Sequence, residues 1–224
     1  KELQGISGQI NINGKQINIP SFSFVQKEGK YTFAGGFNID SGAISGDLNA
    51  ENGGMADLLA ILNVPVKDFD GRLNGRITVQ GTANKPSISL IGTLANGKVK
   101  NYPLDTIEVD VAFENDVVKI NKFYAKQGNG VLAARGTAAL HGALNLEVGG
   151  RDIDAGLLTT WFDSTIDTRG TLNFAAQVTG TSAMPHASVS LEIKGGGVAN
   201  ATFDSLFGLF VLDNNNIAVN QLML

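Results

Sequence analysis

The sequence contains an internal repeat, and this repeat constrains the fold more than any other feature. The stretch GRLNGRITVQGTANKP, from Gly71 to Pro86, recurs without a gap as GTLNFAAQVTGTSAMP, from Gly170 to Pro185. Matching residues are 99 positions apart, as Gly71 and Gly170 show, and further glycine, valine and asparagine residues downstream keep this offset. Such a chain is expected to fold as an array of similar units.

Alternation of apolar and polar residues is the dominant pattern between the turns. In TIEVDVAFE, from Thr106 to Glu114, every second residue is apolar. This pattern predicts a β-strand with one apolar and one solvated face. Turn-forming pairs such as Asn13-Gly14 and Asn96-Gly97 follow at intervals of about 8 to 12 residues, which is typical of hairpins. We therefore predict a long antiparallel meander.

Two short segments have helical rather than strand periodicity. Met55–Val64 and Asp154–Phe162 carry apolar residues at helical spacing, and Pro65 is expected to end the first helix. Two such helices cannot cover the apolar face of about fifteen strands. The sheet must therefore curve onto itself, as a sandwich, a closed barrel or an open trough. The tandem repeat favours an all-β fold with two short helices, a meander curved into an open, U-shaped trough.

The apolar sets of the alternating strands are the candidate functional residues. Because side chains alternate across a strand, each set is expected on the concave face of the trough. We predict that the groove is lined by Ile107, Val109, Val111, Phe113, Leu172, Phe174, Val178, Val189, Leu191 and Ile193. Small residues on this face, such as Ala187 and either Ala175 or Ala176, favour an incompletely packed lining over the dry interior of a structural β-solenoid.

Composition argues against several classes of site and partner. The net charge of −4 and the lack of a Lys/Arg cluster argue against nucleic acid. No cysteine and only two histidines are present, so we expect no catalytic residues, metal or cofactor, and no enzyme activity. Asp152 and Asp154 flank a predicted helix start, where capping is their expected role.

The repeat also predicts how the chain is divided. We expect one continuous, elongated domain with a partial repeat over residues 1–66, a full unit over 67–165 and a partial unit over 166–224. The apolar run at Ile217–Leu224 has a counterpart that continues into a further strand. We therefore expect part of a longer protein, with open strand edges through which the chain self-associates.

The repeated motif, Gly-x-Leu followed by Val-x-Gly-Thr-x-x-x-Pro, resembles the repeats of the AsmA-like and TamB family of Gram-negative envelope proteins, in the region called DUF490. The resemblance covers Gly71–Ala125 and Gly170–Leu224. It implies a periplasmic "β-taco" trough, anchored in the inner membrane and reaching an outer-membrane Omp85-type partner of the TamA kind. The implied function is translocation of phospholipid, held by its acyl chains, between the two membranes. Assembly of outer-membrane proteins such as autotransporters, or a purely structural role, are the alternatives.

Overall fold

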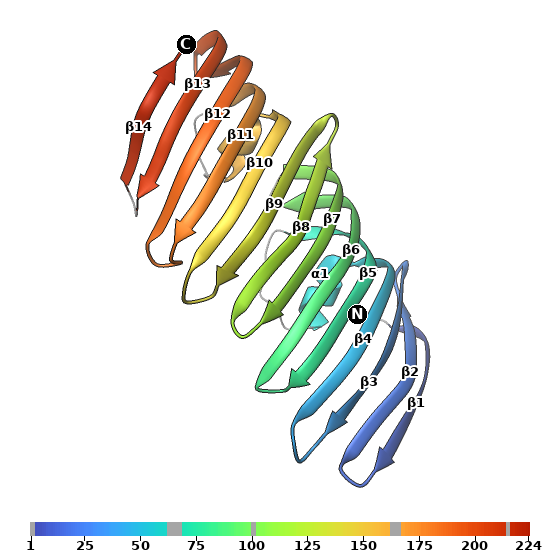
Figure 1. Cartoon of the computed structure of the whole chain (residues 1–224). Helices are drawn as coiled ribbons and strands as arrows, with labels where there is room; N and C mark the ends of the chain where they lie inside the picture. Colours follow the sequence, from blue (N-terminus) through green and yellow to red (C-terminus); the bar gives the residue numbers. More distant parts are fainter. Residues whose placement is uncertain (1–2, 62–68, 100–101, 162–166, 214–215) are drawn as a thin grey trace.

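The computed structural model describes residues 3–61, 69–99, 102–161, 167–213 and 216–224. Over these residues the chain forms one sheet of fourteen strands, in which each strand pairs antiparallel with the next one in the sequence, and two short helices (Figure 1). The elements in chain order are β1 Gln4–Asn13, β2 Gln16–Gln26, β3 Gly29–Asn38, β4 Ala43–Gly54, α1 Met55–Ile61, β5 Phe69–Thr82, β6 Lys85–Val99, β7 Tyr102–Glu114, β8 Val117–Gln127, β9 Gly130–Ala139, β10 Leu144–Asp154, α2 Gly156–Trp161, β11 Thr168–Gly180, β12 Pro185–Val198, β13 Ala201–Asp213 and β14 Asn216–Met223.

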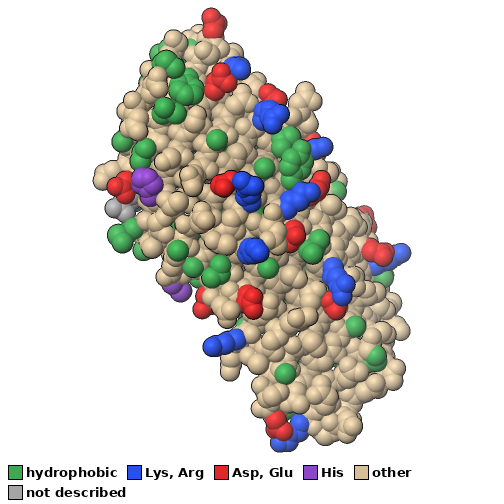
Figure 2. Space-filling model, in the orientation of Figure 1, with side chains coloured by type: hydrophobic (Ala, Val, Ile, Leu, Met, Phe, Trp, Pro, Cys, Tyr) green, Lys and Arg blue, Asp and Glu red, His purple; other side chains and the backbone are tan. Residues whose placement is uncertain are grey.

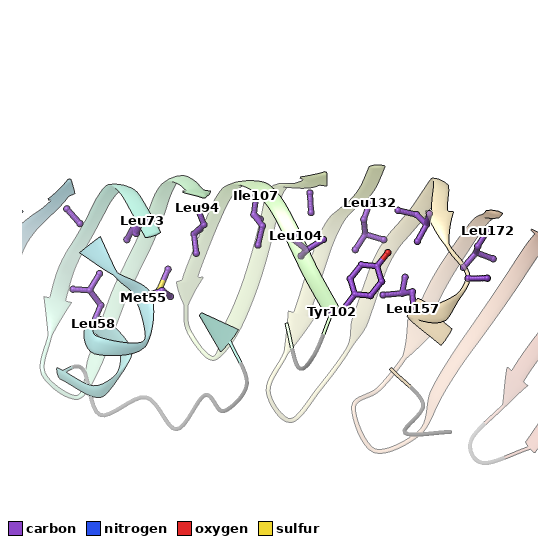
Figure 3. Close-up of a cluster of buried hydrophobic side chains, with 14 of the residues drawn as sticks. Met55, Leu58, Leu73, Leu94, Tyr102, Leu104, Ile107, Leu132, Leu157 and Leu172 are labelled. Atoms are coloured by element: carbon purple, nitrogen blue, oxygen red, sulfur yellow. The ribbon is translucent and has the colours of Figure 1, made fainter. Parts of the chain in front are cut away.

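The sheet is an open trough, as the sequence predicts. β1 and β14 lie at opposite ends of the strand order and do not pair with each other, so the sheet does not close into a barrel. Its strands arch over a row of buried side chains, with the helices beneath the arch (Figure 3). The accessible surface of 13358 Å² is well above the about 9,800 Å² expected of a compact monomer of this mass. The all-β trough is thus confirmed.

The sequence repeat corresponds to six strands and one helix. β3–β8 and β9–β14 are successive units, each with its helix between its second and third strands. The same hydrogen bond recurs in both: the backbone N–H of Asn52 donates to Asn74 Oδ1, and that of Asp152 donates to Asn173 Oδ1. The acceptors Asn74 and Asn173 are 99 positions apart, but the donors Asn52 and Asp152 are 100 positions apart. The offset between the two units is therefore 100, not 99, on the strand that precedes each helix. The expected unit boundaries, at 66/67 and 165/166, lie outside the described residues.

Glycines of the repeated motif end its first strand. Gly81 and Gly180 have φ values of +99° and +84°, a region that side-chain-bearing residues rarely enter. A Cβ atom would lie 2.6 Å from the Lys85 carbonyl oxygen in the first unit and 2.5 Å from that of Met184 in the second. The recurrence of glycine here therefore has a backbone cause.

Both predicted helices are present within the described residues, and one predicted turn is wrong. α1 begins at Met55, and Gly156 at the start of α2 donates its N–H to Asp154 Oδ1, which is the expected capping role. Asn96-Gly97 is not a hairpin turn but a bulge inside β6, with Asn96 at a φ of +52°. Gly195, at a φ of +54°, occupies the equivalent bulge in β12. A bulge bends a long strand, which allows it to follow the arch.

Candidate functional site

Strand register places the ten predicted lining residues on one face of the sheet. Val109 lies opposite Phe123, and pairing continues on the same face through Ala134 and Val148 to Ala176. Residues two apart on each strand share that face, so it holds Ile107, Val109, Val111, Phe113, Leu172, Phe174, Val178, Val189, Leu191 and Ile193. The helices pack against the same face, which we call the inner face.

The half of the inner face next to the helices is a dry core. Its side chains contact Met55 and Leu58 of α1 or Leu157 of α2 within one continuous cluster (Figure 3). The strand residues of this cluster that are at most 5% exposed include Leu73, Leu94, Leu104, Ile107, Ala125, Leu132, Ile153, Leu172 and Ile193. Three of the predicted lining residues, Ile107, Leu172 and Ile193, therefore pack in the core and do not face an open groove. We call this region the helix half.

The other half of the inner face runs from this core to the hairpins at the far rim. Most of its residues are only partly buried, although Ile77 and Ala187 are buried, at 8% and 7% exposed. Val111 and Phe113 on β7, Val178 on β11 and Val189 on β12 are all partly exposed there. The three remaining predicted residues lie between the two halves: Val109, Phe174 and Leu191 are partly exposed and pack against the core. We call this region the open half, and it is the candidate site.

Over the described strands β4 to β13, the open half carries no charged side chain. From β4 to β13, the paired residues on the inner face between the helix half and the rim are Gly, Ala, Pro, Val, Ile, Leu or Phe. Charges lie on the outer face instead, where Lys122 pairs with Glu108 at 2.5 Å and Arg135 with Glu147 at 2.6 Å. Figure 2 shows positive and negative side chains intermixed on the face of the molecule in view. A continuous apolar wall that water reaches is expected to bind apolar molecules.

Small inner-face residues create less space than the sequence suggests. Ala176 lies on the inner face opposite Val148 and Val189, whereas Ala175 lies on the outer face. The ring of Phe174 covers Gly150, where a Cβ atom would lie 2.4 Å from it. The aromatic ring thus fills the space above the glycine.

Two tyrosines that the sequence analysis missed close the core at the start of each helix. The Gly54 backbone N–H donates to the Tyr31 hydroxyl at 3.0 Å, and the Tyr102 hydroxyl donates to Gln127 Oε1. Burial raises the pKa of both hydroxyl groups. For Tyr102, burial and the nearby Asp154 carboxylate together raise the pKa to about 12. Both tyrosines belong to the first unit, on β3 and β7, and the strands of the second unit contain no tyrosine, so the repeat gives no signal for them.

A large hollow lies outside the open half. It encloses about 910 Å³, and most of its lining comes from the outer face, between Tyr124, Arg135 and Leu209, over a floor that includes Ala133 and Ala175. Its rim is polar and carries the Arg135–Glu147 ion pair, so it is not part of the apolar groove.

The described residues hold no group of three or more acidic or histidine side chains suited to a metal ion. None of the helices within them has the length and hydropathy required to span a bilayer. Comparison with known proteins found no family model, no curated protein and no solved structure that matches the chain. The candidate site therefore has to be interpreted from its own geometry.

Proposed function

We propose that the open half of the trough conducts phospholipid by holding its acyl chains. The observation that supports this most is the charge-free apolar wall, partly exposed to water, that continues across the sheet from strand to strand. Apolar surface of this kind gains about 25 cal/mol per Å² when it is covered by another apolar group. A lipid tail can cover it anywhere along the wall, because successive strands present similar side chains.

The resemblance of the repeats to the AsmA-like and TamB family agrees with this proposal. On that basis the chain would act in the periplasm, between the inner and outer membranes, as part of a protein anchored in the inner membrane. An Omp85-type partner of the TamA kind would receive the lipid through regions outside this sequence. A trough that continues strand by strand suits such a path, since its groove has no closed end.

Lipid uptake by the purified chain tests the proposal. Vesicles of phosphatidylethanolamine and phosphatidylglycerol, doped with a fluorescent phospholipid, are incubated with the protein, and the lipid that leaves with the protein is measured after separation. Native mass spectrometry then identifies the bound species. We expect lipid bound through its tails, irrespective of headgroup.

Neighbouring residues on opposite faces provide matched controls. Val111→Glu places a carboxylate on the inner wall, and Ala112→Glu places the same group on the outer face of the same strand, opposite Lys119. A desolvated charge costs several kcal/mol beside a lipid tail, so Val111→Glu should abolish uptake and Ala112→Glu should preserve it. Leu191→Arg and Ser190→Arg form a second pair on β12. Equal uptake by the inner-face and outer-face variants would refute the groove.

A further inference from the structure

The two edge strands differ from almost all others in composition. β1 and β14 contain no Asp, Glu, Lys or Arg, and every residue in both strands is exposed. Among the described strands only β2 also lacks charge. Monomeric proteins usually protect exposed strand edges with lysine, proline or inward-pointing charges. Bulges occur in β1 and β14 but also in interior pairs such as β2 and β3, so they do not distinguish the edge strands.

Both edge strands extend the apolar wall to the ends of the sheet. On β1 the inner-face isoleucines, Ile10 and Ile12, are 59% and 70% exposed. On β14 the inner-face residues Ile217 and Val219 are 70% and 55% exposed. Their exposure results from the missing neighbour strand, since interior strands with similar side chains are partly buried. An added strand would cover backbone and side chains together.

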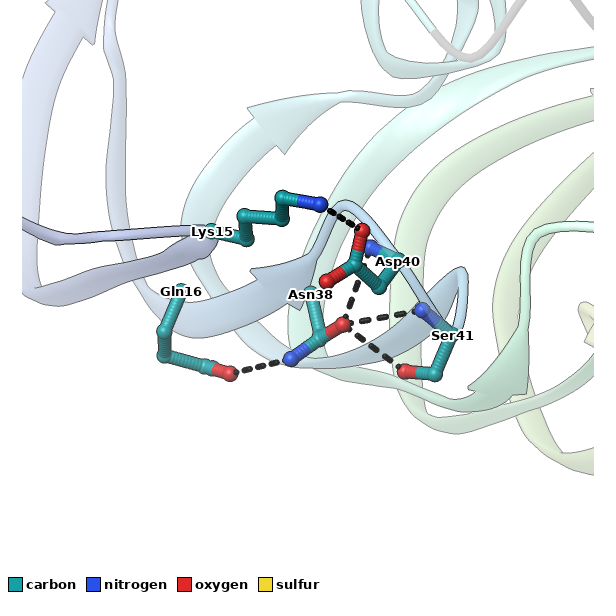
Figure 4. Close-up of polar contacts among 5 residues, drawn as sticks. All are labelled: Lys15, Gln16, Asn38, Asp40 and Ser41. Carbon is teal, nitrogen blue, oxygen red and sulfur yellow. Dashed lines mark hydrogen bonds and ion pairs between the residues drawn. The ribbon is translucent and has the colours of Figure 1, made fainter.

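The first hairpin, formed by β1 and β2, contacts the next hairpin at the rim. The turn that follows β1 is tied to the turn between β3 and β4, because Lys15 Nζ contacts Asp40 Oδ1 at 2.5 Å (Figure 4). In addition, the Ile39 N–H donates to the Lys15 carbonyl at 2.9 Å. Asn38 Nδ2 also donates to Gln16 Oε1 at 3.1 Å. The first hairpin is thus fixed to the next one at the rim.

We propose that β14 pairs along its open edge with β1 of a second copy of this chain. β1 runs from the helix half towards the rim, and β14 runs from the rim towards the helix half. Antiparallel pairing of β14 with β1 therefore places rim beside rim and helix half beside helix half. Pairing of β14 with another β14 would instead bring the open half of one copy against the core of the other.

This arrangement makes the apolar wall continuous from one copy to the next. The contact is heterologous, because two different edges meet, and each added copy exposes a new β14. Association is therefore open-ended and rises with concentration. It depends on the edges alone and does not require that the groove carry lipid.

Charges introduced at outer-face positions of β1 and β14 test the pairing and leave the inner wall unchanged. Both variants carry Ala218→Glu and Asn220→Glu on β14. One adds Gln9→Glu and Asn11→Glu on β1, and the other adds Gln9→Lys and Asn11→Lys. Like charges across neighbouring strands repel, and opposite charges attract. Sedimentation velocity over a concentration series measures association. The mean mass of the parent chain should rise with concentration, and association of the Glu/Glu variant should be weaker by roughly tenfold or more. The Glu/Lys variant should still associate at low salt.

Three results would overturn the proposal. The first is a parent chain that stays monomeric at every concentration. The second is association of the Glu/Glu variant equal to that of the parent, which would place the contact elsewhere. The third is loss of association in both variants, which is the outcome for β14–β14 or β1–β1 pairing. Far-UV circular dichroism and thermal unfolding establish that both variants keep the fold.

Discussion

Truncation of one leucine in each half of the inner face measures how differently the two halves are packed. Leu172 on β11 is 0% exposed in the helix half, whereas Leu146 on β10 is partly exposed in the open half, opposite Val178. Leu→Ala removes three carbons, worth about 0.8 kcal/mol each in transfer free energy. A cavity adds to this only where the surroundings cannot collapse or admit water. We therefore expect Leu172→Ala to cost about 3 to 4 kcal/mol and Leu146→Ala about 1 kcal/mol.

Urea denaturation followed by far-UV circular dichroism measures both free energies of unfolding. The comparison requires that the dependence of this free energy on urea be the same in the parent and both variants, since a changed slope indicates a changed unfolded state or a partly unfolded intermediate. Equal costs near 3 kcal/mol would show that the open half is packed as densely as the core. That result would remove the accessible wall on which the proposed function rests.

Three further predictions concern the repeat and Tyr102. Asn74→Ala and Asn173→Ala should each lower the free energy of unfolding by about 1 kcal/mol, because each removes the equivalent hydrogen bond to a bulged backbone N–H; clearly unequal costs in urea denaturation would contradict the equivalence of the two units. Gly180→Ala should cost about 1 to 3 kcal/mol from strain at a φ of +84°, and a thermal midpoint equal to that of the parent would refute this. Tyr102 keeps its proton up to a pH of about 12 in the folded chain but loses it near pH 10 when unfolded, so the unfolded state binds fewer protons between these values and stability falls as the pH rises through them. Tyr102→Phe should remove this part of the alkaline loss, and an unchanged pH dependence of the unfolding free energy above pH 10 would argue against it.

The sequence predicts the fold class because the alternation of apolar residues and the repeat act over many residues at once. Strand alternation in Thr106–Glu114 and the motif at Gly71 both survive local exceptions. Asn96-Gly97 is such an exception: a residue with positive φ suits a hairpin turn and a bulge equally well. Only the pairing of the whole of β6 with β5 decides between them.

The sequence predicts which face of the sheet holds the candidate site, but not the division of that face into a buried half and an open half. Period-two alternation determines which side of a strand a residue is on, and this places Ile107 and Val111 together. It contains no information on which residues the helices cover. That depends on which strand residues join the buried cluster around Leu58 and Leu157. Ile107, Leu172 and Ile193 belong to this cluster, whereas Val111 stays partly exposed.

The division of the inner face also allows a partly exposed apolar wall to exist in a folded chain. Backbone groups of the interior strands are paired along the sheet, so the open half needs no side-chain packing of its own to satisfy its hydrogen bonds. The core around Leu58 and Leu157 holds the same strands at their other ends. Substitutions in the open half should consequently alter what the wall binds more than they alter stability. For this reason a loss of lipid uptake in Val111→Glu, with an unfolding free energy near that of the parent, would report on the groove itself.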